Sequence, residues 1–275
     1  MTVFINNEFV PEEKALLHVS DLAIQRGYGV FDFFKVVNSV PVFLQEHLDR
    51  FYFSAEQMHL NVAYSKDELK KIISALIEKN NAANTGVRIT LTGGYSPDGY
   101  QLFKPNLVIA LRPLTPPTED QFQNGIKLLT YQHQRQLPQA KTIDYLMAIW
   151  LQPFIKENAA DDVLYHQNGW VSECPRSNFF IVTHENKIIT PSKNILKGVM
   201  RSKLIEVTKT SFEIEERALS VDEIKNAKEA FISSTTKMLI PVHQIDECIF
   251  SKDHSITTQV FQSLLQLQNS YVQSA

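Results

Sequence analysis

Apolar and polar positions in the first part of the chain follow two periods, one typical of strands and one of helices. Runs dominated by apolar residues predict strands at 3–10, 30–37, 87–92 and 106–111. Apolar residues at helical spacing predict helices at 45–59 and 66–80, the second capped by Ser65. The strand at 30–37 is apolar on both faces apart from Asp32 and Lys35.

The rest of the chain alternates more tightly between the same two patterns. Strands are predicted at 126–131, 163–166, 179–183, 187–190 and 230–233. Helices are predicted at 143–158, 201–210, 221–225 and 256–270. No internal repeat or low-complexity segment interrupts this order, so the chain is predicted to be a mixed α+β protein.

One segment resembles a boundary between two folded parts. Pro113, Pro116 and Pro117 fall within the segment 112–120, where proline excludes both a helix interior and a central strand. The sequence therefore predicts an N-terminal α+β domain at 1–113, a linker at 114–120 and a second domain at 121–275.

The composition is that of an ordinary globular protein, with 44% hydrophobic and 21% charged residues. The chain has 27 basic and 30 acidic residues, so a broad basic surface for nucleic acid or anionic membrane is not expected. The longest apolar stretch, 145–155, is too short to span a bilayer, and the first residues lack the basic region of a signal peptide. We therefore expect a cytoplasmic protein.

Several common types of site are excluded by spacing. Cys174 and Cys248 form neither a Cys-x-x-Cys pair nor a disulfide framework. The eight histidines lie too far apart in sequence for a zinc motif, so no metal site is expected. The nine glycines form neither the Rossmann fingerprint nor a P-loop.

Two residues are candidates for chemistry near the middle of the chain. Lys141 lies in Pro138-Gln-Ala-Lys-Thr-Ile-Asp-Tyr145, directly before the most apolar predicted helix. A lysine there is either a solvated charge or, if desolvated, a neutral amine able to form a Schiff base. Glu173 lies near a strand end, where it either faces water or pairs with a pyridinium nitrogen.

Three further features could bind a phosphate. Gly198 lies directly before a predicted helix, so Val199 and Met200 would offer backbone N–H groups at its N-terminus. The run Ser233-Ser-Thr-Thr236 follows a predicted strand with four hydroxyl groups. Arg50, on the helix at 45–59, could contribute a cation, although a surface salt bridge is the ordinary role of such a residue.

Taken together, these features resemble the class IV, fold-type IV family of pyridoxal-phosphate aminotransferases. A lysine is followed 32 residues later by a carboxylate (141 to 173), then by a leucine-glycine turn and a Ser/Thr run. Gly27-Tyr-Gly-Val-Phe-Asp32 and Glu46-His-Leu-Asp-Arg50 resemble two N-terminal sequence blocks of this family. The family includes D-amino-acid and branched-chain aminotransferases and aminodeoxychorismate lyase.

The resemblance implies a two-domain fold-type IV enzyme that resembles D-amino-acid aminotransferase and holds pyridoxal phosphate between its domains. Lys141 would form the Schiff base and act as the proton-transferring catalyst, and Glu173 would bind the pyridine nitrogen. Leu196 would pack against the cofactor ring, with Tyr145 near its phenolic oxygen. The implied phosphate ligands are Arg50, Val199, Met200, Ser234 and Thr235. A homodimer whose partners are small-molecule substrates, an amino acid and a 2-oxo acid, is also implied.

The sequence departs from the family at the substrate side. Gly93 replaces the arginine that familiar D-amino-acid enzymes use for the substrate carboxylate, and Phe31 replaces their tyrosine. Arg26 and Arg88 are the available replacements, because the planar guanidinium binds a carboxylate through two hydrogen bonds. The expected substrate-binding residues are Arg26, Phe31, Arg88 and Thr236.

The choice of substrate stays open at this point. Two arginines in the N-terminal part and the loop at 93–100 resemble a D-amino-acid arrangement more than the branched-chain one, which favours a D-amino acid as the amino donor. The alternatives are a branched-chain L-amino-acid aminotransferase and a lyase that makes 4-aminobenzoate. A protein that binds the cofactor without catalysis is disfavoured, because both Lys141 and Glu173 are present.

Overall fold

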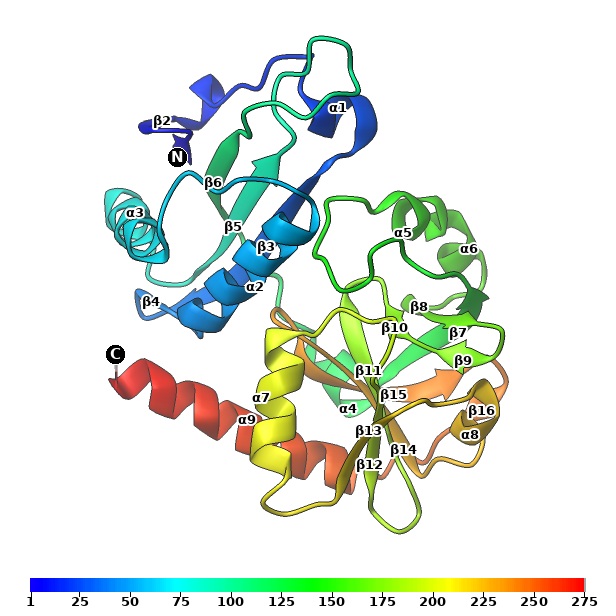
Figure 1. Ribbon diagram of the computed structural model, residues 1–275. Helices are drawn as coiled ribbons and strands as arrows, with labels where there is room; N and C mark the ends of the chain where they lie inside the picture. The colour runs from blue at the N-terminus through cyan, green and yellow to red at the C-terminus, as the bar shows by residue number, and fades with distance from the viewer. Residues whose placement is uncertain (275) are drawn as a thin grey trace. The chain divides into compact units, whose positions relative to one another are not determined.

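The structure, a computed structural model, describes residues 1–274 and divides into two compact units (Figure 1). The first unit contains Met1–Leu114, Ala140–Asp144 and residues 271–274, and the second contains Thr115–Gln139 and Tyr145–Ser270. The division predicted at 114–120 differs from this one chiefly around Lys141, whose segment groups with the first unit. The reason is that this segment pairs with a strand of the first unit.

Among the described residues, the strands of the first unit form one six-stranded sheet in the order β2-β1-β6-β5-β3-β4. These strands are β1 (Thr2–Ile5), β2 (Glu8–Pro11), β3 (Gly29–Val37), β4 (Val40–Pro41), β5 (Thr85–Thr92) and β6 (Leu107–Arg112). The helices of the first unit are η1 (Glu12–Lys14), α1 (Leu22–Arg26), α2 (Leu44–Gln57) and α3 (Lys66–Lys79). The single strand predicted at 3–10 is a hairpin, because the chain turns at Asn6 with a φ of 54°.

The core of the first unit lies between its sheet and helices α2 and α3. Alternate residues of β3, including Phe34 and Val36, belong to the same buried cluster as residues of α2 and α3. The helix predicted at 66–80 is confirmed, and Ser65 and Glu68 form the capping box at its start. The predicted helix at 45–59 corresponds to α2.

Within residues 1–274, the second unit contains a ten-stranded sheet, whose main path runs β13-β12-β11-β14-β15-β7-β8-β9. Its strands are β7 (Ile126–Gln132), β8 (Asp162–Gln167), β9 (Trp170–Val171), β10 (Glu173–Cys174), β11 (Ser177–Val182), β12 (Ile188–Pro191), β13 (Ile214–Arg217), β14 (Glu229–Ser234), β15 (Met238–Ile245) and β16 (Cys248–Ile249). Its helices are α4 (Glu119–Gln123), α5 (Leu146–Trp150), α6 (Gln152–Glu157), α7 (Val199–Thr208), α8 (Val221–Ile224) and α9 (Ser255–Ser274).

The helix predicted at 143–158 is wrong in its start and its continuity. The segment Ala140–Asp144 is not helical and pairs with β3 at Thr142, and the helical part that follows is divided at Leu151 into α5 and α6. Pro153 at the start of α6 lacks a backbone N–H, which suits the first turn of a helix and not its interior. The strand β15 was absent from the prediction.

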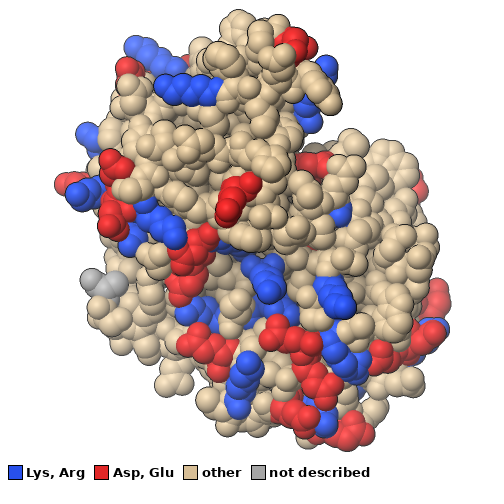
Figure 2. Space-filling model, viewed as in Figure 1, with Lys and Arg blue, Asp and Glu red and all other residues tan. Residues whose placement is uncertain are grey.

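The surface carries both signs of charge. On the face shown in Figure 2, Lys and Arg side chains are interspersed with Asp and Glu side chains. In the described part of the chain, no helix has both the length and the apolar character needed to cross a bilayer. In the same residues, no group of three or more His, Cys, Asp or Glu side chains could hold a metal ion.

Candidate active site

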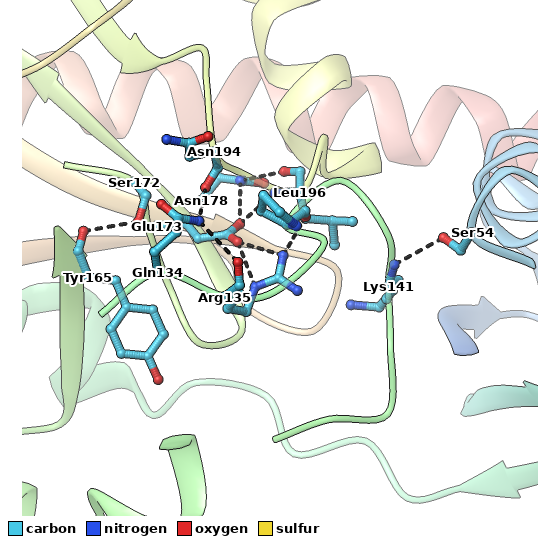
Figure 3. A network of polar contacts seen from close by, with 11 residues as sticks. Ser54, Gln134, Arg135, Lys141, Tyr165, Ser172, Glu173, Asn178, Asn194 and Leu196 are labelled. Atoms are coloured by element: carbon cyan, nitrogen blue, oxygen red, sulfur yellow. Dashed lines mark hydrogen bonds and ion pairs between the residues drawn. The ribbon is translucent and has the colours of Figure 1, made fainter. Parts of the chain in front are cut away.

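The segment that carries Lys141 is fixed to the first unit along its backbone. The carbonyl of Lys141 accepts a hydrogen bond from Phe31 N at 3.0 Å, and Ile143 N donates to the carbonyl of Gly29 at 3.0 Å. The backbone N–H of Lys141 donates to the Ser54 hydroxyl of α2, also at 3.0 Å (Figure 3). The segment therefore extends the edge of β3 and gives the lysine a defined backbone position.

Two cationic side chains lie over the ring of Phe31. The Lys141 Nζ is 4.6 Å from the ring centroid, and the Arg88 Cζ is 4.0 Å from it. Arg88 is on β5, directly across from Phe33, and the alternation along the strands puts it on the same sheet face as Phe31. The aromatic ring attracts both cations through its negative face. Phe31, Arg88 and Lys141, predicted separately as site residues, are thus brought together.

Arg50 lies in a buried ion pair. Its Nε and Nη2 donate to the two carboxylate oxygens of Asp32, each at 2.8 Å. His47, one helical turn earlier on α2, lies 2.7 Å from the same carboxylate through its Nδ1. The Arg50 and His47 contacts outweigh burial and hold the pKa of Asp32 well below its ordinary range. Burial lowers the pKa of His47, so its neutral form is favoured at pH 7.

Arg26 lies at the exposed end of α1, where Gly27 adopts a left-handed conformation with a φ of 65°. The loop at 93–100 lies against this helix, because Leu22 N donates to the carbonyl of Gly94 at 3.0 Å. A Cβ on Gly99 would lie 3.5 Å from the Arg26 Nη2. Arg26 therefore belongs to the surface formed by α1 and the glycine loop of the first unit.

Glu173 is buried in the second unit, with 5% of its surface exposed. Its Oε1 accepts hydrogen bonds from Arg135 Nε at 2.9 Å and Nη2 at 2.7 Å (Figure 3). Its Oε2 accepts from the backbone N–H of Leu196 at 2.9 Å. This exposure excludes a carboxylate that faces bulk water, and the Arg135 guanidinium forms an ion pair with it.

The turn that contains Leu196 is fixed by Asn178. The Asn178 Nδ2 donates to the Leu196 carbonyl at 2.8 Å, and Asn178 is the β11 residue paired with Glu173 of β10. A Cβ on Gly198 would lie 2.2 Å from the Asn178 Oδ1, so any other residue there would displace the Asn178 side chain that fixes the turn. Glu173, Leu196 and the start of α7 are thus held in one arrangement.

The N-terminus of α7 and the turn after β14 are suited to bind an anion. Gly198 is the N-cap of α7, and no side chain caps the N–H groups at this end. In the other segment, Ser234 Oγ accepts a hydrogen bond from Lys237 N at 3.3 Å and keeps its own proton for donation. Ser234, Thr235 and Thr236 are half-buried in this turn. These donors fit the phosphate of the cofactor that the sequence predicts.

Sequence reasoning missed four residues that organise these groups. Asp32 and His47 lie within the two N-terminal sequence blocks but were not assigned a role, and Ser54 and Arg135 belong to no motif. A lone carboxylate in an apolar strand was the available signal for Asp32. Tyr145, in contrast, was predicted and lies half-buried at the N-cap of α5.

Comparison with known proteins gives consistent matches. The model of the family described as amino-transferase class IV matches residues 29–245. D-alanine aminotransferase from Bacillus licheniformis is 29% identical over 253 residues, covering 90% of this chain and 89% of that protein. A putative branched-chain-amino-acid aminotransferase from Methanocaldococcus jannaschii is 28% identical, covering 90% and 88%. The crystal structure of the Escherichia coli branched-chain amino acid aminotransferase has a TM-score of 0.90 at 24% identity, covering 97% and 94%.

Proposed function

Since this chain belongs to the class IV aminotransferases, we propose that it is a pyridoxal-phosphate enzyme that transfers the amino group of a D-amino acid to a 2-oxo acid. The aminotransferase activity follows from the membership of this family. The preference for D-amino acids rests on the arginine beside Lys141 and on the 29% identity to a D-alanine aminotransferase.

The donor set fits pyridoxal phosphate. Lys141 would attach the cofactor, and the carboxylate of Glu173 would hold the proton of its pyridine nitrogen. Leu196 would pack on the ring, with Tyr145 near the phenolic oxygen. The proposed phosphate ligands are Arg50, Val199, Met200, Ser234 and Thr235. When bound, the cofactor supplies an electron sink for the substrate carbon that loses its proton.

The juxtaposition of Arg88 and Lys141 is the observation that carries the substrate assignment. Both groups lie over the Phe31 ring, at 4.0 Å and 4.6 Å from its centroid. A guanidinium there can bind the substrate carboxylate while the lysine amine takes the proton from the adjacent Cα. The side on which the carboxylate is bound decides which enantiomer presents its Cα proton to the lysine.

Arg26 is proposed as a second contact of the substrate carboxylate, because it is exposed beside the glycine loop. Thr236, next to the proposed phosphate-binding hydroxyl groups, is proposed to line the substrate side. A second candidate function, branched-chain L-amino-acid transamination, is favoured by the 28% identity to the archaeal relative. In that case Arg88 would contact a substrate side chain or the second substrate.

We also propose a homodimer. Helix α5 has no buried residue, and its side chains Leu146, Ile149 and Trp150 are 72%, 69% and 62% exposed. An apolar group of this kind is typical of a protein interface. Size-exclusion chromatography with light scattering tests the dimer, which a Trp150→Glu substitution is expected to weaken.

The substrate is tested with a panel of D- and L-amino acids, each offered with pyruvate or 2-oxoglutarate. Chiral chromatography identifies the amino acid that is consumed and the one that is formed. Exchange with D-alanine or D-glutamate is expected. Exchange only with L-leucine, L-isoleucine and L-valine would establish the branched-chain function, and formation of 4-aminobenzoate from aminodeoxychorismate without an oxo acid would establish the lyase.

A further inference from the structure

Asp32 occupies a position where the pattern of β3 calls for an apolar residue. Val30, Phe34 and Val36 share its side of the strand, and all three belong to the hydrophobic core. Asp32 itself is fully buried, with 0% of its surface exposed. A buried ion pair seldom stabilises a fold more than apolar residues of similar size would. A stabilising role therefore gives a poor account of this carboxylate.

The hydrogen bonds of Asp32 define how Arg50 is held. Because the ionised carboxylate carries no proton, the 2.7 Å contact with His47 requires the imidazole proton to be on Nδ1. Asp32 Oδ1 also accepts from the backbone N–H of Phe33 at 2.7 Å. Oδ1 thus has three hydrogen-bonding partners and Oδ2 has one, and residues of both the strand and α2 fix the position of the carboxylate.

Arg50 uses only one edge of its guanidinium for this contact. The Nε and one N–H of Nη2 face Asp32. Nη2 also lies 3.3 Å from His47 Nδ1, which cannot accept a hydrogen bond while it carries the proton, so three of the five N–H groups stay available for another acceptor. The side chain is 10% exposed, so most of it is enclosed. The free edge is suited to a second, doubly hydrogen-bonded anion such as a phosphate.

We propose that Asp32 and His47 are positioning residues that hold the Arg50 guanidinium ready for the cofactor phosphate. The inference rests on the proposed function, because it takes the phosphate of pyridoxal phosphate as the anion. An arginine side chain has many rotamers, and fixing it before binding removes that ordering entropy from the binding step. Asp32 thereby increases the affinity of Arg50 for the phosphate without touching it.

Asp32 could instead weaken phosphate binding or have no effect on it, and these alternatives make the proposal testable. If Asp32 merely competed for the guanidinium, its removal would free Arg50 and tighten phosphate binding. If Asp32 were only a structural group, its removal would lower stability and leave the recognition of phosphate unchanged. The ratio of affinities for pyridoxal phosphate and for pyridoxal, which lacks the phosphate, separates these cases.

The experiment is a titration of apoenzyme with pyridoxal phosphate and with pyridoxal, followed by protein fluorescence, for the wild type and five variants. Asp32→Asn is expected to weaken pyridoxal phosphate about tenfold and to leave pyridoxal unchanged. Arg50→Ala is expected to weaken pyridoxal phosphate roughly ten- to hundredfold. In the double variant, the loss should equal that of Arg50→Ala alone, because both changes remove one shared contact.

Asp21→Asn is the matched control. Asp21 is equally buried in the same unit, and its carboxylate accepts hydrogen bonds from Thr92 and Asn106 and not from Arg50. This variant is expected to lower the melting temperature and to keep the wild-type affinity ratio.

Arg50→Lys is a second test of the proposal. It keeps the charge on a largely enclosed side chain, so it tests whether a positioned guanidinium is needed even if Asp32→Asn does not fold. The preference of Arg50→Lys for pyridoxal phosphate over pyridoxal should fall as far as that of Arg50→Ala, because one ammonium cannot bridge Asp32 and a phosphate in the same way.

The proposal is overturned if Asp32→Asn prefers pyridoxal phosphate over pyridoxal as strongly as the wild type does, or more strongly. It is also overturned if the losses of pyridoxal phosphate affinity from Asp32→Asn and Arg50→Ala multiply in the double variant. It is equally overturned if Asp21→Asn lowers the ratio as much as Asp32→Asn does, or if Arg50→Lys retains the wild-type ratio. A wild type that binds neither compound would instead contradict the proposed function, so the two failures are distinguishable.

Discussion

The backbone N–H of Lys141 donates a hydrogen bond to the hydroxyl of Ser54, which lies 87 positions earlier in the chain. Ser54 is fully buried on α2, one turn after Arg50. One face of this helix therefore fixes the backbone of the proposed catalytic lysine and carries the proposed phosphate ligand. A single helix would thus position both proposed groups.

Ser54→Ala removes the acceptor of the Lys141 N–H. A buried donor that loses its partner destabilises a protein by about 1–3 kcal/mol, so the free energy of unfolding in urea should fall by that amount. Retention of covalently attached cofactor should fall as well, because the lysine loses its fixed position. Ser263→Ala, an exposed serine change on α9, serves as the control and should alter neither quantity.

Lys141→Ala should abolish transamination and the covalent attachment of cofactor together. The far-ultraviolet circular dichroism should remain that of the wild type, because the backbone contacts of residue 141 do not involve its side chain. Mass spectrometry after borohydride reduction measures the attachment. Normal turnover in this variant would refute the assignment of Lys141, and Lys71→Ala, at an exposed position, controls for loss of a lysine.

Glu173→Gln keeps the shape of the side chain and removes its charge. Cofactor should still bind, whereas single-turnover loss of the substrate Cα proton should slow by roughly a hundredfold or more, the range for losing one electrostatic contact. Glu229→Gln is the matched control, since Glu229 is equally buried in the second unit and caps α9. Glu229→Gln should lower the stability and leave the rate of proton loss unchanged. An unchanged rate of proton loss in Glu173→Gln would show that Glu173 does not act on the cofactor ring.

Arg88→Ala should raise the KM for D-amino acids and their oxo acids by about tenfold or more, because a charge-assisted contact to the substrate carboxylate is lost. Arg26→Ala should have a smaller effect. The visible absorption of bound cofactor should persist in both variants, since neither arginine is assigned to the cofactor. Steady-state kinetics provides the measurement, and wild-type KM values in both variants would contradict the assignment.

Lys35 should make stability depend on pH in an alkaline window. Burial lowers its pKa to about 8, against 10.5 for the ordinary side chain. Between these values the unfolded chain binds more protons, so the free energy of unfolding should rise with pH by up to about 3 kcal/mol. Below pH 8 the charged amine is buried, and Lys35→Met should therefore be more stable than the wild type at pH 7. Urea unfolding from pH 7 to 10 tests this, with Lys71→Met as the exposed control; a constant difference between Lys35→Met and the wild type would contradict it.

Periodicity predicted the regular elements well where one face of an element is apolar. The strand at 30–37 and the helices at 45–59 and 66–80 correspond to β3, α2 and α3. Periodicity predicted the secondary structure poorly around 143–158, where the apolar run suggested one helix. There the backbone of Lys141 and Ile143 pairs with β3, a contact between distant segments that no local pattern contains.

The chemistry-bearing residues were visible in the sequence because their types and spacings are covalent properties of the chain. Lys141, Glu173, the Gly198 turn and the Ser/Thr run formed a recognisable series without any coordinates. These features led to the family, which the match over residues 29–245 confirms. The roles of the individual residues toward the cofactor stay predictions.

The sequence by itself determined the family, the main helices and strands, and the candidates for chemistry, because each depends on residues near in sequence or on fixed spacing. Only the tertiary structure decided the partners: Asp32 for Arg50, 18 positions apart, and Arg135 for Glu173, 38 positions apart. A buried charge must find a hydrogen-bonding partner wherever the fold brings one within reach. Its identity depends on which element faces meet when the core closes, and no local pattern records that.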